Sequence, residues 1–418
     1  MSTIIPPDLV KKLNRKYKLE EKPYFFDNNS YNTTHCIRIN PSKRANSFLY
    51  QKRIPWCEEG YCGTTHIQPE TDPLFYAGCY CVQDAASMFI AHLLKTLQVK
   101  QSPIKVLDIS GGRGTLGTLL LDNTHPESLI VVNESKPSAL PSLISTLTKW
   151  GNANSFVSNN VSKAFSTLPA YFDMILFYSP YLGQAQNKGG QQETLVSSEQ
   201  DKQKILDCLS SLRTNGILIY ASHSNTEEEN DEIVKWLCAE QQMEPIRIEI
   251  DPSWTIQQKP TTGFYFKNEL HSRAFFVTAL RKKKEQEPFI RSDKHTHQAL
   301  SSHNELMKKW IKTDVKMCTV IKNDFINIFP ESLINDFNTL QQHLQLQKTG
   351  IAMGKFAGDQ LIPHTSLAFS TFLHPKIPRK TVSKKDALHL LSQEEKDGQR
   401  EGIPSTLLTY EGFGIGWS

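Results

Sequence analysis

Apolar and polar positions alternate along the middle of the chain in the way that a layered sheet requires. The apolar runs are IKVLDIS, SLIVVNES, FDMILFYSP and NGILIYASH, and helix-length segments such as 136–150 and 197–213 separate them. Short runs rich in β-branched and aromatic residues are typical of buried strands. Their alternation with helices predicts βαβ units, and hence a parallel sheet with helices on both faces.

The regions on either side of this sheet have different patterns. Apolar residues recur at helical spacing between Val82 and Leu94, which predicts an amphipathic helix packed on a core. Residues 282–303 are polar and without periodicity, so we interpret them as a linker. Strand-like patches then precede a short helical pattern near 384–394. These patches predict a small α+β domain.

The chain length agrees with this organisation, because 418 residues correspond to about three domains at roughly 150 residues each. We expect an N-terminal extension over 1–100 and a Rossmann-like sheet domain over 101–281. The linker at 282–303 leads to a C-terminal domain over 304–418. The predicted fold class is α/β, with small α+β parts at both ends.

Composition excludes several classes of protein. A hydrophobic share of 39% with 22% charged residues is ordinary for globular chains and excludes fibrous or wholly disordered ones. Lys and Arg number 47 against 43 Asp and Glu, so affinity for nucleic acid has to come from local clusters. No apolar run approaches the ~18 residues that cross a bilayer, and the N-terminus lacks a signal-peptide pattern. We therefore expect a cytoplasmic protein without a membrane partner.

The cysteine pattern favours neither disulfides nor a metal. Eight cysteines in 418 residues do not make a disulfide framework. The pairs Cys57-x4-Cys62 and Cys79-x-Cys81 do not match the paired spacing of a zinc site. We predict no metal centre.

A glycine-rich turn after the first apolar strand is the candidate cofactor loop. It reads Ser110-Gly111-Gly112-Arg113-Gly114, and an apolar helical pattern follows it. Amide groups at a helix N-terminus point at a ligand there, although such turns also serve simply to make tight connections. Glu134 ends the next strand, about 20 residues further on, where a carboxylate can bind both ribose hydroxyls. The loop lacks G-x-G-x-x-G spacing, so S-adenosylmethionine is favoured over NAD.

The order of motifs resembles the Sun/Fmu family of RNA cytosine-5 methyltransferases, and in particular its RsmF-like branch, which modifies small-subunit ribosomal RNA. The resemblance covers most of the chain and implies a Rossmann-like methyltransferase sheet with RNA-binding parts at both ends. The segments that carry it are IRINPSK, DPLFYAGCYCVQDAASMF, VLDISGGRGTLGTLLL, NESKPSALPSLISTLTKWGNAN, FDMILFYSP, NGILIYASHSNTEEENDEIVKWL and LIPHTSLAFS.

Methylation at cytosine C5 needs a thiolate that adds at C6, and elimination afterwards frees the product. The resemblance places the family's nucleophilic cysteine at His223 and its product-release cysteine at Tyr181. Neither tyrosine nor histidine supplies a thiolate. The family's loop lysine, catalytic aspartate and adenine-side acid are also replaced. They correspond to Leu116, Tyr178 and Val161.

These replacements predict a retained fold with lost chemistry, a pseudoenzyme. For each change alone, family drift with the role moved to a neighbouring residue is the simpler reading. Cys208 and Cys238 are in helix-like segments away from the motifs, however, and free cysteines are usually buried hydrophobes. Cofactor binding is expected to be weak or lost, because Val161 offers no carboxylate on the adenine side.

Two acid-free basic stretches are candidate RNA contacts. The first combines basic residues with Phe48, Tyr50 and Trp56, which suits phosphate neutralisation plus base stacking; a solvated basic strand face would give the same pattern. The second stretch spans 374–385. The basic residues of the first stretch are Arg38, Lys43, Arg44, Lys52 and Arg53, and those of the second are Lys376, Arg379, Lys380, Lys384 and Lys385.

The end of the chain resembles the RNA-binding C-terminal part of RsmF-like proteins. In those proteins the segment that corresponds to TYEGFGIGW forms the edge of a small barrel, and further sequence usually follows that segment. We therefore expect a truncated last domain with an open strand edge, which favours aggregation.

Three functions follow from these features. The first is a monomeric RNA-binding protein of RsmF-like descent that binds ribosomal RNA and has impaired methyl transfer. The second is an active methyltransferase that uses an atypical residue. The third is a ribosome-assembly scaffold that binds neither cofactor nor RNA tightly. Titration with S-adenosylmethionine separates an active enzyme from a scaffold.

Overall fold

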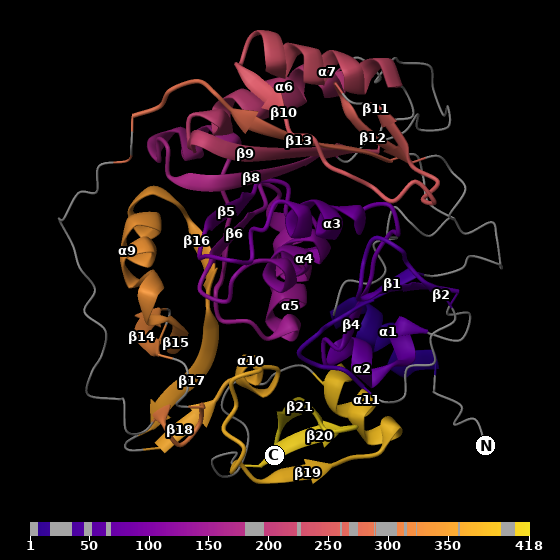
Figure 1. Ribbon diagram of the computed structural model, residues 1–418. Coiled ribbons are helices and arrows are strands. Elements are labelled where there is room, and N and C mark those ends of the chain that lie inside the picture. The colour runs from indigo at the N-terminus through magenta and orange to yellow at the C-terminus, as the bar shows by residue number, and fades with distance from the viewer. Residues whose placement is uncertain are drawn as a thin grey trace.

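A large α/β body makes up the centre of the molecule, and smaller sheets from both ends of the chain pack against it (Figure 1). The computed structural model describes residues 7–16, 36–45, 52–63, 68–179, 196–223, 227–259, 261–266, 275–287, 289, 307–312, 316–322, 324–357, 360–393 and 406–418. Among these residues, no helix has the length and apolar character needed to span a membrane.

The central sheet has ten strands, parallel in the middle and antiparallel at both edges. In spatial order the parallel strands are β7 (Ser155–Ser158), β6 (Leu129–Asn133), β5 (Lys105–Asp108), β8 (Phe172–Ser179) and β9 (Leu212–Ser222). Antiparallel strands beyond β9 are β13 (Phe275–Lys282), β12 (Gly263–Phe266), β11 (Gln257–Lys259) and β10 (Met243–Pro245). From β5 the chain adds β6 and β7 on one side of the sheet and then β8 and β9 on the other, so the strand order changes direction between β5 and β8. Ligands of such sheets bind outside the carboxyl ends of the strands at this point.

Alternate side chains of the parallel strands build two separate cores. Val106 and Val132 face one core, whereas Leu107 and Val131 face the other. The helices α3 (Phe89–Thr96), α4 (Thr115–Asn123) and α5 (Leu140–Trp150) contribute to the first core. The helices α6 (Val196–Leu209) and α7 (Glu227–Ala239) and the 3-10 helix η3 (Ser162–Thr167) contribute to the second. The predicted Rossmann-like sheet, covered on both faces, is confirmed.

The N-terminal part forms a four-stranded sheet of its own, in the order β2-β3-β1-β4. Its elements are α1 (Pro7–Lys16), β1 (Cys36–Ile39), β2 (Lys52–Arg53), β3 (Gly60–Cys62), α2 (Pro73–Tyr76) and β4 (Tyr80–Val82). The predicted helix from Val82 is corrected, because β4 ends at Val82 and α3 begins at Phe89. A turn intervenes, in which the Asp84 carboxylate accepts a hydrogen bond from the amide of Ser87 at 2.9 Å.

The C-terminal part contributes to three different sheets. One strand, β16 (Leu346–Thr349), pairs with β7 at the edge of the central sheet, and the helix α9 (Ile334–His343) adds Phe337 to the second core. A separate sheet contains β14 (Met317–Lys322), β15 (Phe325–Pro330), β17 (Ile351–Ala357) and β18 (Gln360–Pro363). The last elements are α10 (Thr365–Ala368), β19 (Arg379–Thr381), α11 (Lys384–Ser392), β20 (Leu407–Tyr410) and β21 (Phe413–Trp417). The helix predicted near 384–394 is confirmed.

Both ends of the chain share one hydrophobic core. Leu13 and Ile37 from the N-terminal part pack in it with Leu388 and Ile415 from the C-terminal part. Cores also cross the boundaries near 100 and 304, since α3 belongs to the first core of the central sheet and α9 to the second. The domain boundaries stay a prediction, but the predicted parts do not have separate cores. Most of the expected linker lies outside the described residues.

The strand β21 is an edge of its sheet, but α10 packs against it (Figure 1). The Trp417 indole donates to the carbonyl oxygen of His364 at 3.0 Å. A side chain at Gly414 would begin 2.1 Å from the carbonyl oxygen of Ala368, so only glycine permits this approach. The edge that we expected to be open is therefore in contact with a neighbouring element.

Candidate functional site

Glycine is required in the loop after β5 for two different reasons. Gly112 and Gly114 have φ values of +50° and +85°, in the left-handed region that other residues avoid. Gly111 lies so close to the next strand that a Cβ would be 2.8 Å from the carbonyl oxygen of Asn133. The loop turns directly into α4, whose first residue is Thr115. The loop therefore lies at the N-terminus of a helix, where an anionic or polar ligand is favoured. The amides of Ser110, Gly111, Gly112 and Gly114 already donate to acceptors within the protein.

The structure brings Glu134 to this loop, as the sequence predicted. One carboxylate oxygen accepts a hydrogen bond from the amide of Gly112 at 3.0 Å, and the other accepts from the amide of Lys136 at 2.8 Å. Each oxygen has further lone pairs, so the carboxylate can still accept from ligand hydroxyls. The half-buried Arg113 lies in the same loop, and the Ser110 amide donates to Asp108 at 3.1 Å.

Asp108 is a further polar group at this site that we did not single out from the sequence. Its side chain is fully buried, and burial raises its pKa to about 7, with the nearby Glu134 charge as a smaller cause. One carboxylate oxygen has no hydrogen-bond partner within the described structure. A buried oxygen without a partner beside a glycine loop suits a donor group on a ligand. The sequence does contain a signal for this group, because Asp108 is an acidic residue at the end of a buried strand.

Val161 and Leu116 are the positions that the resemblance assigns to the family's adenine-side acid and loop lysine. Val161 follows β7 and its side chain is 67% exposed, which is unusual for a large apolar residue. The preceding segment is fixed, because the Asn133 side chain donates to the carbonyl oxygen of Asn160 at 3.0 Å. Leu116 is buried in the first turn of α4. The two positions therefore offer apolar contacts in place of charges.

Aromatic rings occupy the ends of β8 and β9, where the family has its thiolate. The rings of Tyr178 and His223 meet edge to face at 5.5 Å between centroids. His223 is buried and also contacts Phe275 at 5.3 Å. Tyr181 lies outside the described residues. Two aromatic rings thus meet at these strand ends, while the hydroxyl of Ser179, the last residue of β8, donates to the buried carboxylate of Asp201.

All eight cysteines lie within the described residues, so each can be placed. Cys36 and Cys62 form a disulfide between β1 and β3, which the sequence did not predict. Desolvation by burial raises the pKa of every free thiol, to about 12 for Cys79 and Cys318. The other thiols with a raised pKa are Cys57, Cys81, Cys208 and Cys238. None of them has the lowered pKa that a nucleophilic cysteine needs.

Two of the predicted RNA contacts are corrected by their burial. Arg38 is 1% exposed and forms an ion pair with Asp122. Lys43 is also buried, and its ammonium group donates to the carbonyl oxygens of Ala77 and Lys149. Hydrogen bonds inside the protein compensate these charges, so neither reaches a phosphate. An acid-free stretch of sequence did not reveal this, because the compensating groups come from distant residues.

The other predicted contacts of the first stretch are at the surface. Lys52 and Arg53 are exposed on the short edge strand β2, and Arg44 is exposed but paired with Glu59. Trp56 is buried among aromatic rings, including that of Phe266 at 5.5 Å, so it is not free to stack on a base. Phe48 and Tyr50 lie outside the described residues.

The five basic residues of the second stretch are exposed, although Ile377 between them is buried. Arg379 and Lys380 lie on the edge strand β19, and Lys384 and Lys385 begin α11. Cations at a helix N-terminus oppose the helix dipole, so helix stability does not explain them. Ser383 caps this helix by accepting from the amide of Asp386 at 3.2 Å. Lys376, Arg379, Lys380, Lys384 and Lys385 are therefore all available to a partner.

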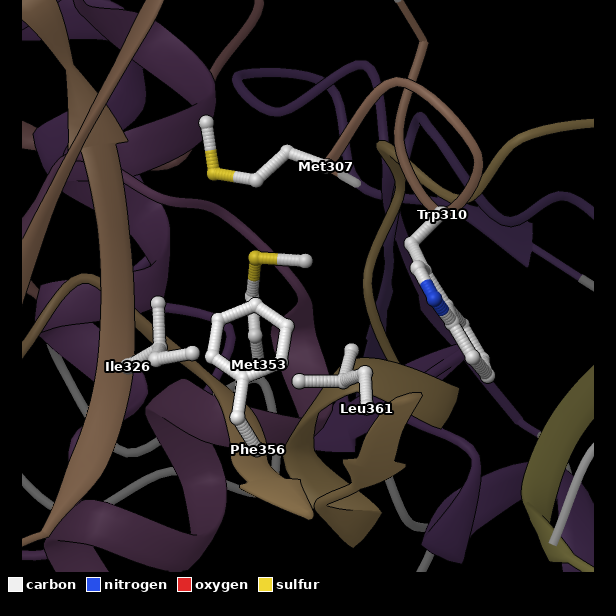
Figure 2. Close-up of a pocket in the computed structure, with 6 residues that line it drawn as sticks. All are labelled: Met307, Trp310, Ile326, Met353, Phe356 and Leu361. Carbon is white, nitrogen blue, oxygen red and sulfur yellow. The ribbon is translucent and has the colours of Figure 1, made fainter. Parts of the chain in front are cut away.

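A shallow apolar indentation lies in the C-terminal part, away from this loop, and it has no interior space for even one water molecule (Figure 2). Figure 2 shows Met353, Phe356 and Leu361 grouped together, with Met307 and Trp310 beside them. No charged side chain lines the indentation, so it does not suit a charged cofactor.

Two family models match consecutive parts of the chain. Residues 5–85 match the N-terminal domain of 16S rRNA methyltransferase RsmF. Residues 74–281 match 16S rRNA methyltransferase RsmB/F. Both the N-terminal sheet and the glycine loop lie within the matched residues.

Curated relatives carry the name ribosomal RNA small subunit methyltransferase F. The protein of Pectobacterium atrosepticum is 27% identical over 248 residues, which are 55% of this chain and 50% of the relative. That of Psychromonas ingrahamii is 25% identical over 339 residues, or 73% of this chain and 68% of the relative. The chain thus spans about half the length of the first relative.

Solved structures share the fold. A methyltransferase homolog from Pyrococcus horikoshii has a TM-score of 0.51 at 20% identity and covers 66% of this chain and 100% of its own. NSun6 from the same organism, solved with SFG, has a TM-score of 0.52 at 14% identity and covers 67% of this chain and 99% of its own. The methyltransferase fold is therefore established for this chain.

Proposed function

Because the chain belongs to the RsmF-like branch of the Sun/Fmu family of RNA cytosine-5 methyltransferases, we propose that it binds ribosomal RNA and, weakly, S-adenosylmethionine, and that its methyl transfer is impaired or absent. One observation carries this proposal. The aromatic pair of Tyr178 and His223 stands at the strand ends, and no free thiol of the chain has a lowered pKa.

The chemistry explains why this observation matters. Cytosine C5 becomes nucleophilic only after a strong nucleophile adds reversibly at C6, and a thiolate does both. An imidazole adds less readily, and near neutral pH part of it is protonated. His223 packs between Tyr178 and Phe275, so its ring also has little room to approach a base.

The cofactor half of the crevice retains the groups that fit a nucleoside. S-adenosylmethionine supplies the electrophilic methyl group when it is bound. Glu134 would accept from the ribose hydroxyls, while the amides from Ser110 to Gly114 line the turn. The oxygen of Asp108 without a partner supports this assignment, since a donor on the ligand would satisfy it. Val161 offers no carboxylate to the adenine, and we therefore propose weak binding.

RNA binding is assigned to exposed cations. We place it on Lys52 and Arg53 and on the second basic stretch, which carries Lys376, Arg379 and Lys380. Phosphate contacts of this kind weaken as salt rises, because binding releases counterions. Both ends of the chain supply these residues, and they share a core.

Methyl transfer is tested with S-adenosylmethionine carrying a tritiated methyl group and small-subunit ribosomal RNA. A relative with both cysteines is the positive control. We expect no transfer by this chain and no denaturant-stable band on gels with 5-fluorocytosine RNA, which traps the covalent adduct. A shifted band would favour an active enzyme with an atypical residue and would overturn the proposal.

RNA binding is tested by replacing Lys376, Arg379 and Lys380 with alanine together. The slope of log affinity against log salt should fall by up to about 2 to 3 units, since each phosphate contact contributes about 0.7 to 0.9. The matched control removes the same charge elsewhere, from the exposed Lys235, Lys283 and Lys284. Equal slopes in both triple variants would contradict this surface. A chain that binds neither RNA nor cofactor would be an assembly scaffold.

A further inference from the structure

Arg38 is buried between the N-terminal sheet and the body, and all three of its guanidinium nitrogens have hydrogen-bond partners. Its Nε donates to Gln83 at 2.8 Å, and one terminal nitrogen pairs with Asp122. The other terminal nitrogen donates to the Thr118 hydroxyl at 2.5 Å and to the carbonyl oxygen of Thr115 at 3.3 Å. This planar fork therefore spans β1 and the helix α4.

The contacts on α4 are spaced so that they form one face of the helix. Thr115, Thr118 and Asp122 are three and four residues apart, the spacing that places side chains above one another. The Trp150 indole completes the cluster, with its ring 4.8 Å from the guanidinium carbon and its nitrogen donating to Asp122 at 2.8 Å. Arg38 thus holds α4 along its length.

The held end of α4 adjoins the candidate cofactor loop. Thr115 is the first residue of the helix and follows Gly114 directly, while the amide of Thr118 donates to the carbonyl oxygen of Gly114 at 2.9 Å. A shift of the first helical turn therefore moves the loop glycines relative to Glu134, whose oxygen accepts from the amide of Gly112.

We propose that Arg38 is a positioning residue for S-adenosylmethionine, acting through the first turn of α4 without contacting the cofactor. The assignment rests on the proposed function of the Gly111–Gly114 loop. It makes the N-terminal extension a part of the cofactor site, because β1 supplies the residue that fixes the loop. Mispositioning of a loop by even a small distance is enough to weaken binding and chemistry.

The test compares Arg38→Lys with Lys43→Met. A lysine at 38 keeps a charge beside Asp122 but lacks the planar fork that reaches Thr118 and Thr115. Lys43 is a buried basic residue of the same region, and its bonds go to Ala77 and Lys149 rather than to α4. Both variants should lose thermal stability, which controls for a general effect.

We expect calorimetric titration to give an S-adenosylmethionine affinity at least fivefold lower for Arg38→Lys and within twofold of the unmodified chain for Lys43→Met. Hydrogen exchange of the amides from Gly111 to Thr118 should accelerate in Arg38→Lys and not in Lys43→Met. Affinity that follows melting temperature in both variants would overturn the proposal.

The two readouts also separate this proposal from the proposed function. If the unmodified chain binds no S-adenosylmethionine, the cofactor assignment fails. Exchange of the loop amides then still decides whether Arg38 holds the first turn of α4, and unchanged exchange in Arg38→Lys would reject that role.

Discussion

The candidate site has a cofactor half, formed by the loop Gly111–Gly114 with Glu134, and a reaction half at Tyr178 and His223. The two halves are formed by different kinds of group. In the cofactor half, backbone amides and the carboxylates of Glu134 and Asp108 face one another across a turn that only glycines can form. In the reaction half, side chains alone decide the chemistry, and the rings of Tyr178 and His223 occupy it. The loop glycines are needed for the packing of the fold, whereas a nucleophilic thiol would be needed only for the reaction. Substitutions in the reaction half should therefore disturb the fold less than substitutions in the cofactor loop.

The largest effect is expected for Asp108, in the cofactor half. Its folded pKa of about 7 exceeds the ordinary value of 3.8, so the folded chain keeps a proton that the unfolded chain releases. The stability from that proton is full below about pH 4 and is lost as pH rises towards 7. With Asp108→Asn, the change in the free energy of unfolding between low and neutral pH should shrink by up to about 4 kcal/mol, since one pKa unit is about 1.4 kcal/mol.

Urea unfolding at pH 4.5 and 7.5 measures this change. The exposed Glu228 on α7 provides a control, because Glu228→Gln should keep the pH dependence of the unmodified chain. The buried carboxyls of Asp84 and Asp122, each with a pKa raised to about 6 by burial, add to the same window in all variants. An unchanged pH dependence in Asp108→Asn would show that Asp108 is ionised in the folded chain.

Gly111→Ala should be the next most damaging change. The new methyl group would lie 2.7 Å from a Val132 methyl and 2.8 Å from the carbonyl oxygen of Asn133. Overpacking of this kind costs about 1 to 3 kcal/mol and should displace the loop. Gly416→Ala is the matched control, because a Cβ there meets no atom within 4 Å. Equal unfolding free energies for the two variants would contradict the close approach at Gly111.

Val161→Asp would add a carboxylate to the cofactor half. If the missing adenine-side acid weakens binding, the variant should bind S-adenosylmethionine about tenfold more tightly or better. A hydrogen bond to a charged group contributes about 1.5 to 3 kcal/mol. Val161→Leu, at the same exposed position, should leave the affinity unchanged. Micromolar binding by the unmodified chain would instead show that this acid is not needed.

His223→Cys should have the smallest effect, because under the proposed function it returns only one of several groups that the resemblance assigns to the family's reaction site. Residues that act as a unit restore little when returned singly. Tyr178 and Leu116 still stand where the family has its acid and its lysine. We expect no adduct with 5-fluorocytosine RNA on a denaturing gel, and a band from His223→Cys alone would show that the reaction half is otherwise intact.

The sequence predicted the parts of the molecule that depend on local pattern. The strand alternation, the loop glycines and the position of Glu134 all follow from spacing within about 30 residues. The burial of Arg38 could not be predicted, because its compensating groups, Asp122 and Thr118, come from an element 80 residues away. The pairing of β16 with β7 could not be predicted either, since strand pairing across nearly 200 residues leaves no local signal in the sequence.

The core shared by the two ends has a consequence for synthesis on the ribosome. Ile37 packs with Leu388, and translation at about 5 to 20 residues per second needs on the order of 20 to 70 s to make the chain between them. During that interval the core around Ile37 has Leu13 and Leu74 from the N-terminal part but lacks its C-terminal residues, such as Leu388 and Ile415. Contacts this distant also slow folding. A nascent chain of this protein should therefore depend on chaperones until its last helix has emerged.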